Sequence, residues 1–476
     1  MMGLVARLEL AHWRRNRALW RPLLATALAV LAAAVWATAE DAAQREAHRE
    51  AANEARGQWE AQGAKHPHGM AHFGDFAFRP AGPLARLDRG VQARLGKVIF
   101  MEGHRQGAPM HADVARAGTV ARFPRPDAAF LLHTLVPLLL VFLGGAGLAR
   151  DRESGRLKLA LVHGARAHAV LGGHTLALWG LGLALLGLGV VAALDTNVEC
   201  GDPAHAAIER LPAFVVLHAL FLALVAAGVV AATAWLPSAR AALLTLLAAW
   251  VLGTALLPRA AAGVADAWFP LPSQDDFQAQ LRASREAGPD GHDPRDAFIA
   301  TRREAMLREH GVDTVEALPL NFDGIAMQLD EEFGNRVWDE HYGALSHQLA
   351  RQVRAVSLAA LVNPFQAIDN LSMTLAGTDL AHDLAFQEQA EAHRRELIAK
   401  LNHEHAYGGS RTGDWSAEAS AEFLAALGGF TYRVPPLAEA LRGRVAELVA
   451  LTFWALLLLA LQRRAARRLE RGTLAC

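Results

Sequence analysis

Six long stretches of the chain are free, or nearly free, of charged side chains, and they limit the possible folds more than any other feature. A helix needs about 20 apolar residues to cross the hydrocarbon core of a bilayer. Stretches without Asp, Glu, Lys or Arg run over 22–39, 128–149, 167–194, 211–239 and 241–258, and a sixth, 448–462, reaches spanning length only as 445–462, which includes Glu447. A soluble protein can bury one such helix, but six of them, in a chain that is 53% hydrophobic, predict an all-α polytopic membrane protein with six transmembrane helices.

The first stretch could also be a cleaved signal peptide, because the small residues Ala37, Thr38 and Ala39 stand before Glu40. The apolar core of a signal peptide is shorter, roughly 7–15 residues. Five further spans follow, so an uncleaved anchor at 22–39 is the simpler interpretation.

Basic residues are concentrated at alternate ends of the six spans. Residues 1–21, 150–166 and 463–476, together with Arg240, hold 16 Lys and Arg against 4 Asp and Glu, whereas the rest of the chain holds 31 against 44. Lysine and arginine are enriched in cytoplasmic loops, so both termini are expected in the cytoplasm. The net charge of −1 therefore hides two surfaces of opposite sign. Because the basic residues follow the segment ends, they give no support for binding to nucleic acid.

On the cytoplasmic side, residues 1–21 are expected to form an interfacial amphipathic helix, because apolar and basic residues recur there at helical spacing. A short cytoplasmic turn separates the spans 211–239 and 241–258, and residues 463–476 form a basic tail. These parts are small, so most of the non-membrane mass of the chain is expected on the other side.

The outer side holds a short loop, 195–210, and two long regions, 40–127 and 259–444. Loops of this length are rarely structureless, and much of their sequence is rich in Ala, Glu, Arg and Gln, so we expect two mainly helical extracytoplasmic insertions. Residues 63–83 and 103–126 carry many Gly and Pro and are expected to be irregular.

The loop between the second and third spans, 150–166, is longer than a turn requires. It continues as a helical stretch in which basic and apolar positions alternate, after a polar opening formed by Arg152, Glu153, Ser154, Gly155 and Arg156. A positively charged turn at the cytoplasmic face would account for these charges without any docking function. A short amphipathic helix is also what a docking site for a soluble partner needs.

An N-terminal interfacial helix, six spans and this loop together resemble the ABC type-2 permeases, the membrane subunits of type V exporters. In that family an Arg-Glu-x-Gly element opens the loop between helices two and three, and Arg152, Glu153, Ser154 and Gly155 match it. The resemblance extends over essentially the whole chain. It implies that 150–166 is a cytoplasmic coupling helix on which an ATPase subunit docks.

The resemblance also implies a function and its partners. The chain would be the transmembrane permease of an ATP-driven exporter that moves an unidentified substrate across a bacterial inner (cytoplasmic) membrane. Two copies of an ABC ATPase and a second permease, identical or homologous, would complete the assembly, with membrane lipid and periplasmic proteins as further partners. The chain has no Gly-x-x-x-x-Gly-Lys-Ser/Thr sequence, so ATP and magnesium are expected on the ATPase, and this chain is expected to bind no cofactor directly and to be no enzyme.

Two motifs in the outer regions narrow the resemblance to one bacterial subset. Residues 66–80 read His-Pro-His-Gly-Met-Ala-His-Phe-Gly-Asp-Phe-Ala-Phe-Arg-Pro, and residues 363–379 read Asn-Pro-Phe-Gln-Ala-Ile-Asp-Asn-Leu-Ser-Met-Thr-Leu-Ala-Gly-Thr-Asp. Both look like signatures of type-2 permeases with large periplasmic domains of unknown function. The similarity supports the fold and names no substrate.

Histidine and methionine are clustered in the first outer region. One group is His66, His68, Met70 and His72, and a second contains Met101, His104, Met110 and His111. Imidazole binds copper, zinc, nickel and iron, and thioether favours cuprous copper. The alternative function is therefore a membrane-anchored periplasmic metal-binding or sensing protein. Histidines that satisfy buried hydrogen bonds or line a surface would give the same pattern.

Signatures of common enzymes do not occur: the sequence contains neither His-Glu-x-x-His nor Gly-x-Ser-x-Gly. Glu447, at the edge of the sixth span, is the remaining candidate for a functional acid. Ionisable residues in or beside a membrane span are often functional. A carboxylate that extends to the membrane surface is the more ordinary explanation.

Overall fold

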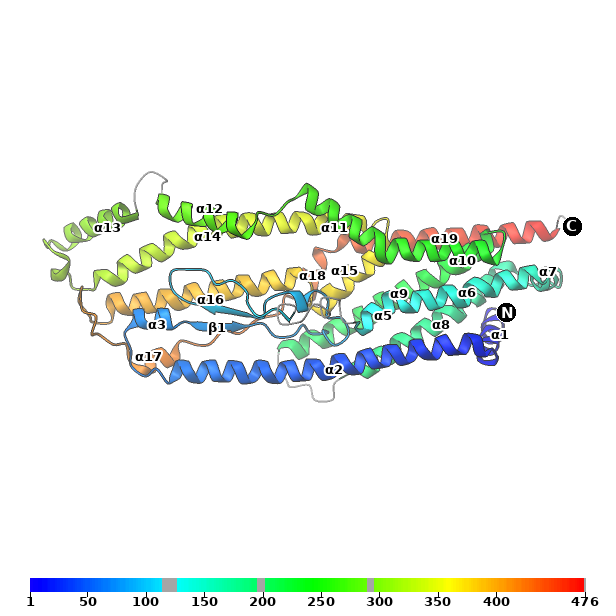
Figure 1. Cartoon of the computed structure of the whole chain (residues 1–476), viewed down its shortest axis with the longest axis horizontal. Helices are drawn as coiled ribbons and strands as arrows, with labels where there is room; N and C mark the ends of the chain where they lie inside the picture. Colours follow the sequence, from blue (N-terminus) through cyan, green and yellow to red (C-terminus); the bar gives the residue numbers. More distant parts are fainter. Residues whose placement is uncertain (114–125, 195–201, 289–294, 475–476) are drawn as a thin grey trace.

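The computed structural model describes residues 1–113, 126–194, 202–288 and 295–474. In these residues the chain is mostly helical and elongated, with both termini at one end (Figure 1). Six helices are long and apolar enough to cross a membrane, and they lie within Arg17–Glu60, Ala128–Glu153, Ala167–Ala193, His205–Trp235, Ala239–Trp268 and Val445–Arg471. The prediction of a mainly helical chain with six candidate spans is therefore confirmed. We call these helices the bundle, and residues 61–127 and 269–444 the distal half.

The N-terminal helix α1 (Met2–Arg15) is separate from the first span, α2 (Arg17–Glu60). Asn16 divides them because its backbone is extended and its side chain accepts the N–H of Ala18 (3.0 Å), which caps α2. The helix expected over residues 1–21 therefore ends six residues earlier. α1 crosses the end of the bundle, whereas α2 runs along most of the length of the molecule (Figure 1). At about 1.5 Å per residue, its 44 residues extend well beyond a bilayer.

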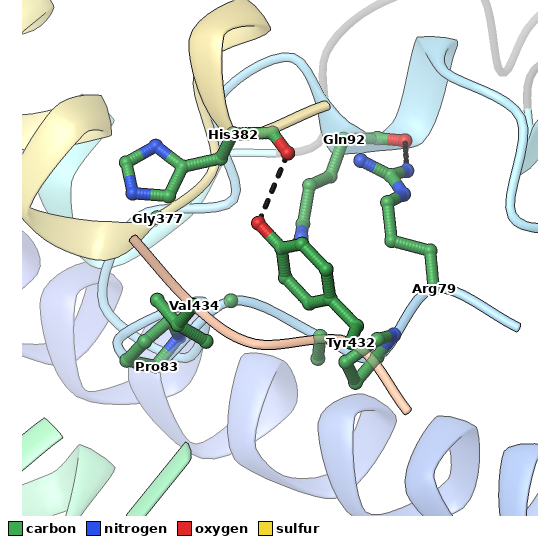
Figure 2. Close-up of a pocket in the computed structure, with 10 residues that line it drawn as sticks. Arg79, Pro83, Gln92, Gly377, His382, Tyr432 and Val434 are labelled. Atoms are coloured by element: carbon green, nitrogen blue, oxygen red, sulfur yellow. Dashed lines mark hydrogen bonds between the residues drawn. The ribbon is translucent and has the colours of Figure 1, made fainter. Parts of the chain in front are cut away.

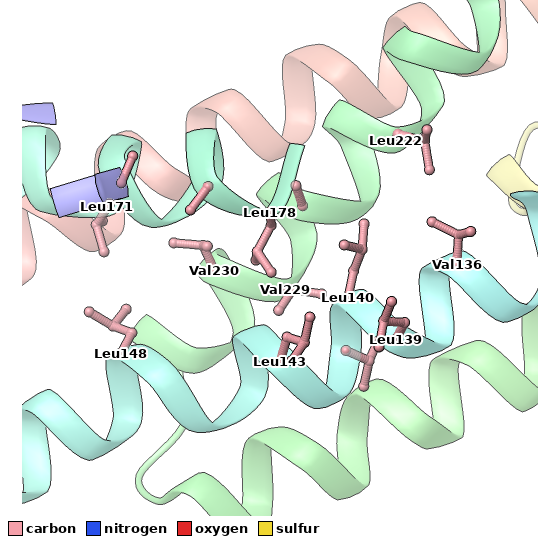
Figure 3. Packing of buried hydrophobic residues seen from close by; sticks show 14 of the residues in the cluster. Val136, Leu139, Leu140, Leu143, Leu148, Leu171, Leu178, Leu222, Val229 and Val230 are labelled. Carbon is pink, nitrogen blue, oxygen red and sulfur yellow. The ribbon is translucent and has the colours of Figure 1, made fainter. Parts of the chain in front are cut away.

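The bundle core forms where α6 (Leu135–Glu153) packs against α8 (Ala167–Ala193) and α9 (Asp202–Trp235). Figure 3 shows buried leucine and valine side chains from these three helices interdigitating. Gly144 permits the close approach, because a Cβ atom there would lie 2.5 Å from Val229 and 2.6 Å from Leu178. Gly173 of the third span likewise permits close approach to Val5 of α1, whereas a Cβ atom at Gly180 or Gly187 would have no neighbouring atom within 4 Å.

Two irregular points in the bundle are closed by side chains from other elements. The second span is divided at Thr134 into α5 (Ala128–His133) and α6, and Trp250 Nε1 donates to the Thr134 carbonyl (2.9 Å). The fifth span consists of α10 (Ala239–Val251), a π-helical turn (Leu252–Leu256) and α11 (Leu257–Trp268). In the π-helical turn, Asn363 Nδ2 donates to the Gly253 carbonyl (2.8 Å). Such turns need external partners for the carbonyl groups that they free.

In the distal half, the described residues of the second outer region are mostly helical, whereas residues 61–113 of the first are mostly non-helical. α11 ends at Trp268, ten residues beyond the expected end of the fifth span at residue 258. The remaining helices and turns are α3 (Pro67–Phe73), η1 (Gln92–Arg94), α7 (Arg156–Val162, at the opposite end of the molecule), α12 (Gln274–Ala287), α13 (Arg295–His310), η4 (Val315–Ala317), α14 (Phe322–Ala359), α15 (Pro364–Ala376), α16 (Leu380–Tyr407), α17 (Ala421–Ala426), α18 (Leu437–Arg442) and α19 (Val445–Leu474).

Residues 63–83 of the first outer region were expected to be irregular, but they contain regular structure. Residues 63–83 contain α3 and the strand β1 (Asp75–Phe78), which pairs antiparallel with β2 (Val98–Met101). The pairing buries Ala77 and Met101 against Phe386 of α16. The two outer regions therefore share a hydrophobic core and do not form separate bodies in the described residues.

Cysteine labelling tests the expected membrane orientation. With Cys200 and Cys476 replaced by serine, we expect Glu309→Cys on α13 and Lys158→Cys on α7 to react with a membrane-impermeant maleimide from opposite faces of the membrane, because the bundle separates the two helices. Intact cells and inside-out vesicles provide the two faces. Labelling of both positions from the same face would refute the six-span topology.

Candidate functional site

The loop between the second and third spans forms an elbow that is fixed to the neighbouring turn. Arg152 donates to the carbonyl oxygens of Thr233 (3.3 Å) and Leu236 (2.6 Å), where α9 ends. Glu153 accepts the backbone N–H of Ala239 (3.1 Å), where α10 begins. A helix carries partial negative charge at its C-terminus and partial positive charge at its N-terminus. The positive Arg152 therefore binds the negative C-terminus of α9, and the negative Glu153 binds the positive N-terminus of α10, on the two sides of one turn.

The bend of the elbow depends on Gly155. Its φ is +75°, a left-handed conformation that glycine adopts without a steric penalty. Arg156 then begins α7, pairs with Asp151 (2.8 Å) and donates from Nε to Ser154 Oγ (3.1 Å). All five residues of the predicted coupling element, 152–156, thus lie in the elbow and define its shape.

α7 presents both charge and apolar surface. Leu157 is buried and anchors the helix, whereas Lys158 is exposed. Leu159 and Val162 are 60% and 66% exposed. A helix held on one side and apolar on the other is suited to contact with a partner.

At the other end of the bundle, a buried polar network joins the bundle to the distal half. Asp379, which precedes α16, pairs with Arg444, which precedes α19 (Nη2 to Oδ2, 2.8 Å). Arg444 also donates to Thr374 Oγ1 of α15 (2.8 Å) and lies 3.4 Å from Glu447. Asn370 donates to the same Glu447 oxygen (2.9 Å). All five residues are buried, so Glu447 lies within the protein and does not extend to its surface.

Arg210 of α9 extends this network. It is fully buried and donates to the backbone carbonyls of Thr374 (3.0 Å) and Pro435. Its Nη1 lies 3.1 Å from His382 Nε2, and His382 Nδ1 lies 2.6 Å from Asp379 Oδ1. A neutral imidazole with its proton on Nδ1 satisfies both contacts. His382 thus connects the carboxylate to a second arginine.

The electrostatics of the network favour an ionised Asp379. Burial alone would raise the pKa of Asp379, but the hydrogen bond from His382, and then the charge of Arg444, hold this pKa well below its usual range. Asp379 also accepts the backbone N–H of His382 (3.1 Å) as the cap of α16. One carboxylate therefore fixes the start of α16 and binds the residue that precedes α19.

The same bundle helices reach both the network and the elbow. α9 carries Arg210 toward one end, and its last carbonyls are bound by Arg152 at the other. α19 begins directly after Arg444, and Glu470 near its far end accepts the backbone N–H of Ala167 (3.0 Å), where α8 begins. Two long helices thus link the distal half to the end that carries α7 (Figure 1).

A narrow pocket beside the network shows how the first outer region joins the second (Figure 2). The Tyr432 hydroxyl group donates a hydrogen bond to the His382 carbonyl (3.0 Å). Arg79 donates to the Gln92 carbonyl (3.3 Å) and pairs with Asp383 of α16 (3.2 Å). The junction is therefore built from both outer regions together with α9 and α19.

The structure separates the residues predicted as metal donors. Met70 is completely buried among apolar side chains of α16 and its neighbours. His66 caps α3, since its Nδ1 accepts the backbone N–H of His68 (3.2 Å). His68 and His72 lie one turn apart on α3 with their Nε2 atoms 3.1 Å apart, and the His104 ring lies beside both. Two residues of the first predicted group, His68 and His72, and one of the second, His104, thus form a three-histidine cluster.

Burial, and then charge repulsion by the neighbouring histidines with His72 first, lower the pKa of His68 to about 4. His68 is therefore neutral near neutral pH, which leaves a nitrogen lone pair free.

Sequence reasoning did not identify Arg210 and Arg444 as functional, although one signal was present. Each stands directly before an apolar span, at 211–239 and at 445–462, on the side expected to be poor in basic residues. A charged residue that is buried beside a span needs an opposite charge or hydrogen-bond partners. The sequence does not reveal that the shared partner is Asp379.

Comparisons with known proteins add one family. The profile of a domain of unknown function, DUF3526, matches residues 276–432, about a third of the chain. The matched region extends from α12 to Tyr432 and includes α15, α16 and Asp379. No curated protein and no solved structure matches the chain.

Replacement of Asp379 tests whether the network holds the two halves together. Asp379→Asn removes the closer carboxylate of Arg444, which keeps only Glu447 at 3.4 Å, and removes the carboxylate that His382 connects to Arg210. Breaking a buried pair typically costs about 3–5 kcal/mol. We expect a clear drop in the thermal unfolding temperature of the detergent-purified chain, measured by tryptophan fluorescence, and faster proteolysis between α14 and α16.

Asp339→Asn is the matched control. Asp339 also pairs with an arginine, Arg395 (2.7 Å), but it is 63% exposed. Exposed pairs contribute about 0–1 kcal/mol, so little change is expected. Equal effects of the two substitutions would contradict the structural role of Asp379.

Proposed function

We propose that the chain is the permease subunit of an ABC transporter, acting in a bacterial inner membrane as an exporter with a separate ATPase. The observation that carries this proposal is the elbow, in which Arg152 and Glu153 bind the α9–α10 turn and hold α7 outward. The structure supplies a physical reason for an Arg-Glu-x-Gly element at this point. The arginine and glutamate fix the elbow, and the glycine permits its bend.

α7 offers the docking surface for the ATPase. Its exposed Leu159 and Val162 would enter an apolar groove of the partner, while Arg156 and Lys158 favour an acidic rim around that groove. The ATPase would supply ATP and magnesium, and two copies would serve two permease chains.

The long helices give the ATPase a route to the distal half. A movement of α7 would act on α9 through Arg152, and α9 carries Arg210 into the buried network. Because helices and buried ion pairs are stiff, such a movement would reach α15 and α16 without an intervening flexible loop. The distal half is thereby a candidate for handling the unidentified substrate or a periplasmic partner.

The second permease, identical or homologous, would pack against helices that the chain itself leaves uncovered. α2, α10, α11 and α19 expose large apolar side chains, including Leu28, Leu244, Val264 and Phe453. Lipid would cover the part of this surface that the second permease does not.

Co-purification with an ABC ATPase tests the proposal. We expect Leu159→Ser combined with Val162→Ser to reduce recovery of the ATPase about tenfold or more, because the substitutions remove the apolar contact and leave the buried anchor Leu157 in place. Gly155→Val should act in the same direction by straining the bend.

Leu358→Ser combined with Val362→Ser provides the control, because these residues are as exposed (60% and 65%) but lie far from the elbow. This variant should retain the ATPase. The proposal fails if no ATPase accompanies the unmodified chain, or if the elbow variants recover it fully.

A further inference from the structure

Three imidazole rings from two separate segments meet at the surface of the distal half. His68 and His72 lie four residues apart on α3, so they share one face of that helix. His104 follows β2 and is brought to α3 by the β1–β2 pairing. One ring nitrogen of each histidine lies within 4.8 Å of the other two.

The positions of the nitrogens suit one metal ion. Nitrogen ligands lie about 2.0–2.1 Å from a tetrahedral zinc ion, which places them about 3.4 Å from one another. The Nε2 atoms of His68 and His72 are already 3.1 Å apart. The rings of His72 and His104 have centroids 5.1 Å apart, so a small rotation of the exposed His72 side chain would complete the set.

His104 is oriented for this purpose by a buried carboxylate. Glu331 of α14 accepts the backbone N–H of His104 and lies 3.1 Å from its Nδ1. Arg394 of α16 binds the other oxygen of Glu331 (3.1 Å). A carboxylate at Nδ1 fixes the proton there and leaves Nε2 free as a ligand, which is the usual arrangement around metal-binding histidines.

The backbone of His104 supports the same conclusion. Its φ is +68°, a left-handed conformation that is unfavourable for a residue with a side chain. The contacts with Glu331 hold the residue in this state. Strained backbone of this kind is concentrated at functional sites.

We propose that His68, His72 and His104 bind one divalent transition-metal ion of the imidazole-preferring class, Zn²⁺ or Cu²⁺. The remaining coordination position faces solvent, because His72 is exposed, and water or an exogenous ligand occupies it. Met70 takes no part because it is completely buried in the apolar core, so the site lacks the thioether that would favour cuprous copper.

Metal binding at this site would also stabilise the distal half. The cluster joins α3 and the turn after β2, and Glu331 and Arg394 connect that turn to α14 and α16. An ion that binds only the folded arrangement raises the stability of both outer regions together. The proposal is independent of the transport function, since it concerns residues far from the elbow and from the buried network.

Metal titration of the full chain, purified in detergent without a polyhistidine tag, tests the site. We expect calorimetry to show one Zn²⁺ or one Cu²⁺ per chain and no binding of Mg²⁺, which prefers oxygen ligands. Bound Cu²⁺ should show nitrogen coupling in its electron paramagnetic resonance spectrum. The bound ion should raise the unfolding temperature, and the Zn²⁺ and Cu²⁺ affinities show which ion the site prefers.

Two single variants identify the ligands. His72→Ala and His104→Ala should each lower the affinity at least about tenfold and remove the metal-dependent rise in unfolding temperature. His347→Ala, an exposed histidine on α14 outside the cluster, should bind as the unmodified chain does. Because His72 is exposed, the His72→Ala variant should fold. Its unfolding temperature without metal should then equal that of the unmodified chain without metal. The proposal is overturned if neither ion binds, or if both cluster variants bind as tightly as the unmodified chain.

Discussion

The ion pair between Asp379 and Arg444 is the interaction on which the arrangement of the two halves depends. Its charged atoms are 2.8 Å apart, and both residues are buried. Removing ions from water costs several kcal/mol each, so such a pair persists only where hydrogen bonds satisfy the remaining polar atoms. Here His382, Thr374 and Asn370 supply or extend those hydrogen bonds. Displacement of α16 from α19 would therefore separate Asp379 from Arg444, and displacement of α15 would remove the hydrogen bonds that Thr374 and Asn370 make with Arg444 and Glu447.

Contacts between charged side chains and helix ends hold the opposite end of the bundle together. Arg152 binds the C-terminal carbonyls of α9, and Glu153 binds the N-terminal amide of α10. Both contacts use the partial charges of helix ends, so they depend on the α9–α10 turn keeping its shape. α9 thus carries a fixed contact at each end, Arg152 at one and Arg210 at the other. This is the physical basis for regarding the distal half and α7 as mechanically connected.

The parts of the structure that the sequence predicts are those governed by local pattern. The six spans follow from uncharged stretches, and the elbow residues 152–156 are local in sequence. The contacts that join the halves could not be predicted, because they bring Arg210, Asp379 and Arg444 together over long separations. Helical spacing places His68 beside His72, but only the β1–β2 pairing adds His104.

Hydrogen exchange of the chain in complex with the proposed ATPase, compared with and without ATP, measures directly whether the elbow and the distal half move together. ATP binding should change the exchange of residues 150–166 and also of residues 364–407, since α9 and α19 connect them through the Asp379 network. A change confined to residues 150–166, with residues 364–407 unaffected, would contradict a rigid connection between the two ends of the molecule.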